Sequence, residues 1–225
     1  MGPDNIVFRV ATWLIPLVFA IVFHEISHGW VANAFGDPTA RERGRLSPNP
    51  LRHVDPIGTV VLPLVLAVAG APVFGWAKPV PVVAERLRSP RFHMVLVALA
   101  GPGMNLSLAL VAAFALAAFG SGEPSSVAGA FVLANLVNFL MINVFLAVFN
   151  LLPIPPFDGG HVVEGLLPRA LAVHYAKLRR FGFALLIFLL LVVPMLFPNA
   201  RIVERVVLPP VRLILGALTG LAGLS

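Results

Sequence analysis

The chain has 225 residues, of which 59% are hydrophobic and 12% charged, and its mean hydropathy is +0.94. This composition is too apolar for an ordinary soluble domain and indicates that the lipid bilayer is the solvent. The net charge of +6 could suggest nucleic-acid binding, but the basic residues lie between apolar segments, which favours membrane topology and no nucleic-acid partner. Cysteine is absent, so disulfides and thiolate metal sites are excluded.

Four charge-free segments stand out along the chain, at residues 10–23, 95–119, 127–153 and 181–197. A spanning helix needs about 20 apolar residues, and the two middle segments exceed that length. The first reaches it only by continuing through His24, Glu25 and His28, which predicts one long helix over residues 7–34. Ionisable groups at membrane depth are costly, so these polar residues predict a functional site.

The apolar stretch at residues 57–77 is interrupted by Pro63, Gly70, Pro72 and Gly75, which predicts a short re-entrant or extended element; a kinked spanning helix is the alternative. With a re-entrant element, twelve of the 16 basic residues lie on one face of the membrane. The positive-inside rule makes that face cytoplasmic. We therefore expect a multi-pass protein of the cell membrane with its site toward the cytoplasmic side.

The C-terminal stretch at residues 202–224 mixes charges and prolines into an apolar background and predicts an interfacial helix. No polar linker is long enough to separate domains. The predicted fold is an all-α polytopic membrane protein with about four to six membrane helices. We expect a single domain over residues 1–225, with a core at 7–160 and C-terminal helices at 161–225.

The sequence His24-Glu25-Ile26-Ser27-His28 places two imidazoles one helical turn apart on one face, where both can bind a zinc ion. Glu25 then lies beside the metal and can act as general base toward the water that attacks a peptide bond. The alternative is a chance pattern with two core or solvated histidines. A lipid-facing segment disfavours that alternative, because unpaired ionisable groups are costly there.

Catalytic zinc usually has three protein ligands, so one more His, Asp or Glu is expected. Asp158 is the best candidate because it follows a charge-free helix and a proline-rich turn, and it approaches the histidines from the same side under the re-entrant topology. An N-cap role for the helix that begins near Gly159 is the alternative, and both roles can coexist. The competing candidates for the third ligand are His161, His53, Asp55 and His93.

Two asparagines flank the inferred site. Asn105 closes the motif Gly101-Pro102-Gly103-Met104-Asn105, and Asn150 opens the stretch that leads to Asp158. Both could bind the substrate backbone or the oxyanion. Interhelical hydrogen bonding is the alternative, and it is preferred for the amides at positions 135, 138 and 143.

Three motifs occur in order over residues 10–160: His24-Glu25-x-x-His28, Gly101-Pro102-x-x-Asn105 and Asn150-x-x-Pro153-x-Pro155-Pro156-x-Asp158-Gly159. Together they resemble the site-2 protease family of intramembrane metalloproteases. Residues 75–82 further resemble its compact branch, which lacks an inserted PDZ domain. The resemblance implies one Zn²⁺ per chain bound by His24, His28 and Asp158, with Glu25 as base. It also implies membrane-anchored protein substrates cut within or near a transmembrane segment, as in regulated intramembrane proteolysis.

Two other functions remain as alternatives. A transporter or channel could use intramembrane histidines to move a metal or protons, but it would not explain Glu25 between them. An inactive relative acting as a scaffold is disfavoured because Glu25 is intact. Residues 78–84 alternate turn-forming and apolar residues and could pair with an unwound substrate as an edge strand; a surface connector is equally compatible.

Overall fold

The computed structural model describes residues 5–61, 65, 77–120, 122, 124–197, 201 and 203–224. Within these ranges the chain is helical and contains no strand. Three of the described helices are long and apolar enough to cross a membrane. The predicted all-α membrane protein is confirmed.

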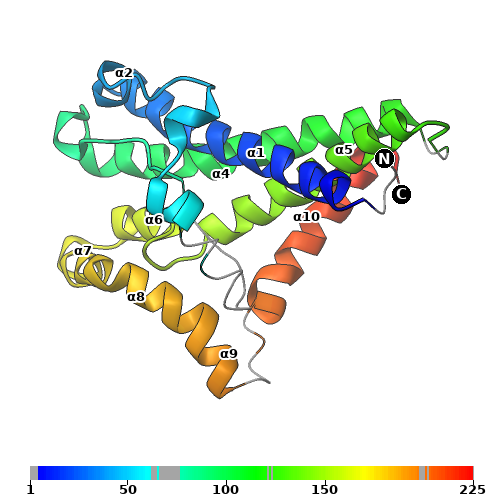
Figure 1. Ribbon diagram of the computed structural model, residues 1–225. Coiled ribbons are helices and arrows are strands. Elements are labelled where there is room, and N and C mark those ends of the chain that lie inside the picture. Colours follow the sequence, from blue (N-terminus) through cyan, green and yellow to red (C-terminus); the bar gives the residue numbers. More distant parts are fainter. Residues whose placement is uncertain are drawn as a thin grey trace.

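The three long helices are α1 (Ile6–Ala34), α4 (Pro90–Phe119) and α5 (Val127–Asn150), which lie side by side (Figure 1). The helix predicted over residues 7–34 is α1, so the polar residues of the motif continue the helix without a break. Its N-terminus is capped by the Asn5 side chain, which accepts a hydrogen bond from the Val7 nitrogen at 2.8 Å. The third apolar segment ends as a helix at Asn150, before the prolines that cannot continue it.

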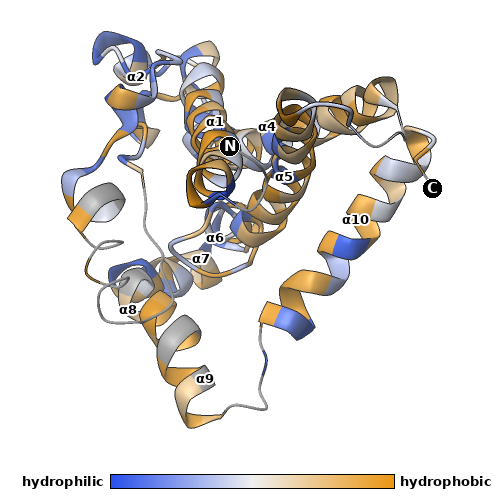
Figure 2. Cartoon of the chain, turned by 45° about the vertical axis from the view of Figure 1, so that its right-hand side comes forward, coloured by the Kyte–Doolittle hydropathy of each residue, from blue (hydrophilic) through white to orange (hydrophobic). Residues whose placement is uncertain are grey.

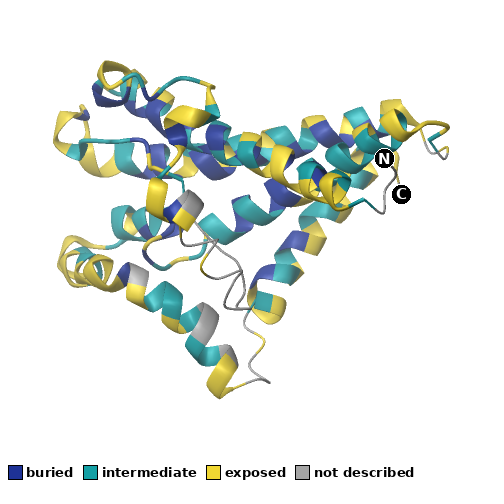
Figure 3. Ribbon diagram, in the orientation of Figure 1, coloured by how far each residue is buried: buried dark blue, intermediate teal, exposed yellow. Residues whose placement is uncertain are grey.

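The outer faces of these helices suit lipid. On α1, Trp13, Leu14 and Phe19 are about half exposed, although all three are strongly apolar. Figure 2 shows apolar residues along α1, α4 and α5, and Figure 3 shows that buried residues gather where the helices meet. A surface of this kind is stable only against an apolar solvent, which agrees with the bilayer predicted from composition.

The core between α4 and α5 is built from small residues on one side and larger ones on the other. Ala109, Ala112 and Ala113 of α4 are almost fully buried and pack near Val144 of α5. Alanines allow two helices to approach closely, which is how helices associate in a bilayer. The helix α10 (Leu208–Leu221) adds Val211 to the same cluster.

Short elements connect the long helices. Between α1 and α4 the chain forms α2 (Thr39–Glu42), η1 (Pro50–His53), η2 (Pro56–Val61) and η3 (Ala84–Arg86). After α5 it forms α6 (Asp158–Leu166), α7 (Arg169–Ala176), η4 (Lys177–Phe181), α8 (Gly182–Ile187), η5 (Phe188–Val192), α9 (Val193–Leu196) and η6 (Val203–Val207). Most of the predicted re-entrant segment at residues 57–77 lies outside the described residues.

One end of the three-helix group brings together segments that are distant in sequence. Arg88, just before α4, donates to the carbonyl of Ala34 at the end of α1, with a nitrogen–oxygen distance of 2.6 Å. Arg91 in the first turn of α4 donates to the carbonyls of Gly165 and Leu167 at the end of α6. The C-terminal end of α1, the N-terminal end of α4 and the segment after α5 therefore meet at the same end.

Candidate metal centre

His24 and His28 lie one turn apart on α1 and point to the same side. Their rings are 4.7 Å apart between centroids and nearly perpendicular, with the two Nε2 atoms separated by 3.1 Å. Both side chains are buried against α4 rather than exposed to lipid. The spacing of the motif therefore produces the facing pair that the sequence predicted.

The helix α4 orients both rings through their Nδ1 atoms. Nδ1 of His24 lies 2.6 Å from Oδ1 of Asn105, and Nδ1 of His28 lies 2.7 Å from the carbonyl oxygen of Val97. Both partners are acceptors, so each Nδ1 carries the proton and donates it. Each Nε2 is left with a lone pair, which is the state in which histidine binds a metal.

Gly101 of α4 explains why the rings can approach the helix so closely. A Cβ atom at this position would lie 2.5 Å from Cε1 of His24 and 2.5 Å from Nε2 of His28. The glycine of the Gly101-Pro102 motif therefore provides the space that the two imidazoles occupy. Pro102 follows it inside the helix, where it removes one backbone donor from the hydrogen-bond ladder.

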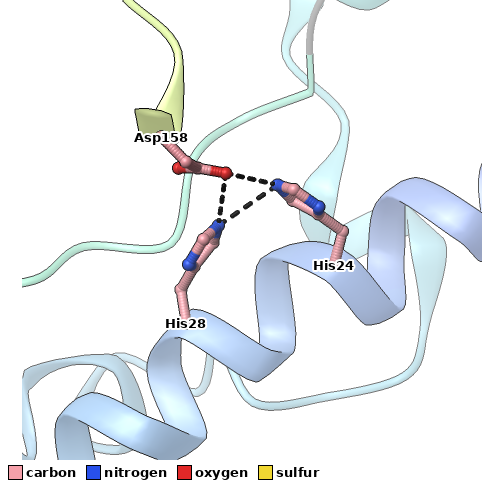
Figure 4. A group of neighbouring side chains, drawn as sticks. All are labelled: His24, His28 and Asp158. Atoms are coloured by element: carbon pink, nitrogen blue, oxygen red, sulfur yellow. Dashed lines mark hydrogen bonds and ion pairs between the residues drawn. The ribbon is translucent and has the colours of Figure 1, made fainter. Parts of the chain in front are cut away.

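Asp158 reaches the histidines from the first turn of α6 (Figure 4). Its Oδ2 atom lies 3.1 Å from Nε2 of His24 and 3.4 Å from Nε2 of His28. The next residue, Gly159, packs against the carbonyls of Leu151 and Leu152, where a Cβ atom would not fit. The N-cap residue of α6 is Phe157, so Asp158 is the first helical residue rather than the cap.

Three acceptor atoms thus converge without a donor among them. Nε2 of His24, Nε2 of His28 and a carboxylate oxygen of Asp158 lie within 4.8 Å of one another. Oδ2 of Asp158 is buried and has no hydrogen-bond partner within the described part of the chain. Convergent lone pairs repel unless a cation lies between them, so this donor set fits a zinc ion, for which two imidazoles and a carboxylate are common ligands.

The electrostatics of Asp158 favour its charged form. Burial by itself raises the pKa of the carboxyl. The interactions with His24 and His28 lower it by more than burial raises it, so the net pKa lies well below the ordinary value. His161, one turn along α6, has its pKa lowered by burial and by the nearby Arg179. The charged carboxylate of Asp158 and the neutral imidazole of His161 therefore both line the cavity.

Glu25 lines a cavity of about 770 Å³ together with His24, His28, Asp158 and residues of α4, α6 and α7. Its Oε2 atom accepts a hydrogen bond from the backbone nitrogen of Val80 at 2.8 Å. The stretch around Val80 is in turn fixed by Arg45, which donates to the carbonyl of Lys78 at 2.5 Å. The carboxylate is thus next to the metal-binding group and is oriented by the backbone of a non-helical segment.

The other candidates for the third ligand lie apart from this group. His53 is buried rather than at the surface, and its Nε2 atom lies 2.9 Å from the carbonyl of Ser47. Asp55 accepts from the backbone nitrogens of Ile57 and Gly58, and His93 stacks on Phe35. His161 lines the cavity, but it is not a member of the convergent group.

The two predicted substrate-binding asparagines occupy different environments. Asn150 lines the cavity, and its amide nitrogen donates to the carbonyl of Leu146 at 3.0 Å. Asn105 is fully buried, and its amide contacts His24, Ala20 and Asn143. These contacts of Asn105 fit the interhelical hydrogen bonding given above as the alternative to substrate binding, and they suit orientation of a histidine.

Several contributing groups were not found from the sequence. The carbonyl of Val97 and the backbone nitrogen of Val80 carry no side-chain signature, and nothing in the sequence distinguishes Arg45 from the other basic residues. The sequence favours a packing role for Asn143. A single amide in an otherwise apolar stretch was the available signal for Asn143, but sequence spacing does not reveal which neighbouring helix it faces.

Comparison with known proteins supports the assignment of this chain as a protease. The profile of Peptidase family M50 matches residues 123–193. The Bacillus subtilis protein named "Putative zinc metalloprotease YwhC" is 38% identical over 191 residues, which cover 80% of this chain and 79% of that protein. Two proteins named "Putative zinc metalloprotease Rip2", from Mycolicibacterium smegmatis and Mycobacterium tuberculosis H37Rv, are each 32% identical. These matches cover 81% and 82% of this chain, and 66% and 67% of the relatives. No solved structure matches the chain.

Helices of membrane-spanning length, a convergent His-His-Asp group and these relatives define the class of the protein, a membrane zinc metalloprotease. More narrowly, the chain belongs to peptidase family M50, the site-2 proteases. The resemblance stated from the sequence motifs is confirmed, as are the enzyme class and the zinc cofactor.

Proposed function

We propose that this protein is an intramembrane endopeptidase whose zinc is bound by His24, His28 and Asp158, with Glu25 as the general base. The observation that carries the proposal is the convergence of three acceptor atoms beside Glu25, in a cavity at one end of three apolar helices. Zinc, when bound there, supplies Lewis acidity that polarises a peptide carbonyl and makes water more acidic.

The residues of the chain then divide the work of peptide-bond hydrolysis. Glu25 accepts a proton at its carboxylate from the attacking water and passes it to the leaving nitrogen. The Val80 backbone nitrogen holds Oε2 of Glu25, which restricts rotation of the carboxylate. Asn150, which lines the same cavity, is proposed to contact the substrate backbone.

The proposed substrates are membrane-anchored proteins, cut within or near a transmembrane segment during regulated intramembrane proteolysis. A substrate helix hides its peptide bonds in its own hydrogen bonds, so cleavage requires an unwound segment at the zinc. The apolar outer faces of α1, α4 and α5 allow a substrate helix to approach through lipid. The non-helical residues 77–83, beside Glu25, offer backbone groups with which an unwound segment can pair.

We also propose a multi-pass topology with the site toward the cytoplasm. The ends of α1 and α5 and the beginning of α4 meet at one end of the molecule, where Arg88 and Arg91 make their contacts. Most basic residues lie in the segments that join these ends, and the positive-inside rule makes this end cytoplasmic. We further propose that residues 1–225 form one domain, because Val211 of α10 is buried against α4 and α5.

The test compares wild type with Glu25→Gln in detergent, measuring zinc content and cleavage of a labelled single-span substrate. We expect one zinc per chain in both proteins and a cleavage rate lower by roughly 10²–10⁴-fold in the variant. Glu164→Gln is the matched control, because Glu164 lines the same cavity but pairs with Arg179. Full activity in Glu25→Gln would refute the role of Glu25 as general base. Zinc-loaded wild type that cleaves none of many substrates would refute the protease and revive a transport function.

A further inference from the structure

Two asparagines form a buried pair in the apolar interface between α4 and α5. Asn105 and Asn143 are each 0% exposed, and Nδ2 of Asn105 donates to Oδ1 of Asn143 at 2.8 Å. The Nδ2 atom of Asn143 donates to the carbonyl of Phe139 on its own helix, also at 2.8 Å. Buried amides in such surroundings are stable only when their groups are paired, and these bonds meet that need.

The direction of each hydrogen bond is determined by its neighbours. Because Phe139 offers only an acceptor, the NH₂ group of Asn143 must face it, and Oδ1 of Asn143 then faces α4. The NH₂ group of Asn105 has two acceptors in reach, Oδ1 of Asn143 and the carbonyl of Ala20 at 3.2 Å. Both hydrogens of that group are therefore used.

The remaining atom of the Asn105 amide, Oδ1, can only face Nδ1 of His24, at 2.6 Å. A flipped Asn105 amide would place an NH₂ group against the protonated Nδ1 and an oxygen against two other oxygens. The chain from Phe139 through Asn143 and Asn105 thus requires the proton of His24 to be on Nδ1. Its Nε2 lone pair then points toward Asp158.

We propose that Asn143 is a positioning residue for the metal centre, acting on His24 through the amide of Asn105. This inference rests on the proposed role of His24 as a zinc ligand. Partners that orient a ligating histidine typically change metal affinity by roughly 10–100-fold when removed. Within the described part of the chain Asn143 makes no hydrogen bond to His24, His28 or Asp158, so its effect on zinc passes through Asn105.

Asn138 provides the matched control. It lies on α5 like Asn143, but it links α5 to α1 rather than to α4, since its Nδ2 atom donates to the carbonyl of Thr12 at 2.8 Å. Within the described part of the chain, Asn138 makes no hydrogen bond to His24 or Asn105. If helix packing alone explained these amides, the two residues would be equivalent.

The experiment measures the zinc dissociation constant of the full chain in detergent by competition with a chelator. We expect Asn105→Leu to weaken zinc binding by roughly 10–100-fold and Asn143→Leu by about tenfold, with Asn138→Leu close to wild type. The double variant Asn105→Leu/Asn143→Leu should bind zinc as Asn105→Leu does, because Asn143 has no separate route to the metal. Asn143→Asp, protonated by burial, keeps a donor for Phe139 and an acceptor for Asn105 and should restore near-wild-type affinity.

Two results would overturn the inference: wild-type zinc affinity in Asn143→Leu, or additive losses in the double variant, which would indicate a general structural role. If Asn143→Leu does not fold, Asn143→Ala carries the same comparison with the same expected loss. Wild-type protein that binds no zinc would instead refute the proposed function, and this inference with it. The two failures are therefore distinguishable.

Discussion

Replacing Gly101 with alanine should weaken zinc binding while leaving the helix intact. The added Cβ atom would lie 2.5 Å from Cε1 of His24 and from Nε2 of His28. Alanine is favoured over glycine in a helix by about 1 kcal/mol, so α4 itself should be stabilised rather than weakened. The substitution therefore separates the metal centre from the fold.

The size of the effect follows from the distances. Non-bonded heavy atoms prefer separations of about 3.5–4.0 Å, so the rings must move by about 1 Å to accept the methyl group. Zinc sites tolerate deviations of only about 0.2 Å in their ligand distances. A displacement several times that tolerance, affecting two ligands at once, should weaken zinc binding by about 100-fold, or ~2.7 kcal/mol.

The assay combines zinc affinity by chelator competition, cleavage of a single-span substrate and thermal unfolding in detergent. Gly103→Ala is the control, because Gly103 lies in the same helix and a Cβ atom there meets nothing within 4 Å. We expect the control to match wild type in zinc affinity and cleavage and to unfold at a slightly higher temperature, because alanine is favoured over glycine in a helix. Gly101→Ala with normal zinc affinity and activity would show that the rings do not pack against α4 as described.

Three further outcomes are expected. Asp158→Ala should lose zinc, whereas His161→Ala should retain it; the reverse result in a metal analysis would reassign the third ligand. Arg45→Leu removes a buried guanidinium that holds the segment beside Glu25, which should lower the free energy of unfolding by about 1–3 kcal/mol. Amide hydrogen exchange in that segment should become faster, and activity should fall at unchanged zinc content. Burial raises the pKa of Asp37, but hydrogen bonds from Thr39 and the Val83 backbone outweigh it and lower the pKa. Asp37 therefore stabilises the fold relative to Asp37→Asn above its ordinary pKa of about 4. Thermal unfolding should show this difference disappear as pH falls from about 4 through the lowered pKa. A difference that grows on acidification would contradict this assignment.

Features that depend on local sequence were predictable. A charge-free run of sufficient length and a helical spacing of four residues predicted α1, which the structure places at Ile6–Ala34, and brought His24 and His28 to one face. Prolines after Asn150 predicted that a helix ends there, and a new helix was expected near Gly159, as α5 and α6 show. These inferences hold because helix geometry and proline stereochemistry act over a few residues.

The sequence by itself determined the long apolar helices, the apolar surface and the residue types of the metal-binding group. Only the tertiary structure decided which atoms meet: that Asp158 approaches both Nε2 atoms, that Gly101 leaves room for the rings, and that Asn105 faces His24 rather than the cavity. The physical reason is that the rotation of one membrane helix about its axis relative to the next is set by side-chain packing across the interface. Residues distant in sequence, such as His24 and Asn143, are related only through that packing.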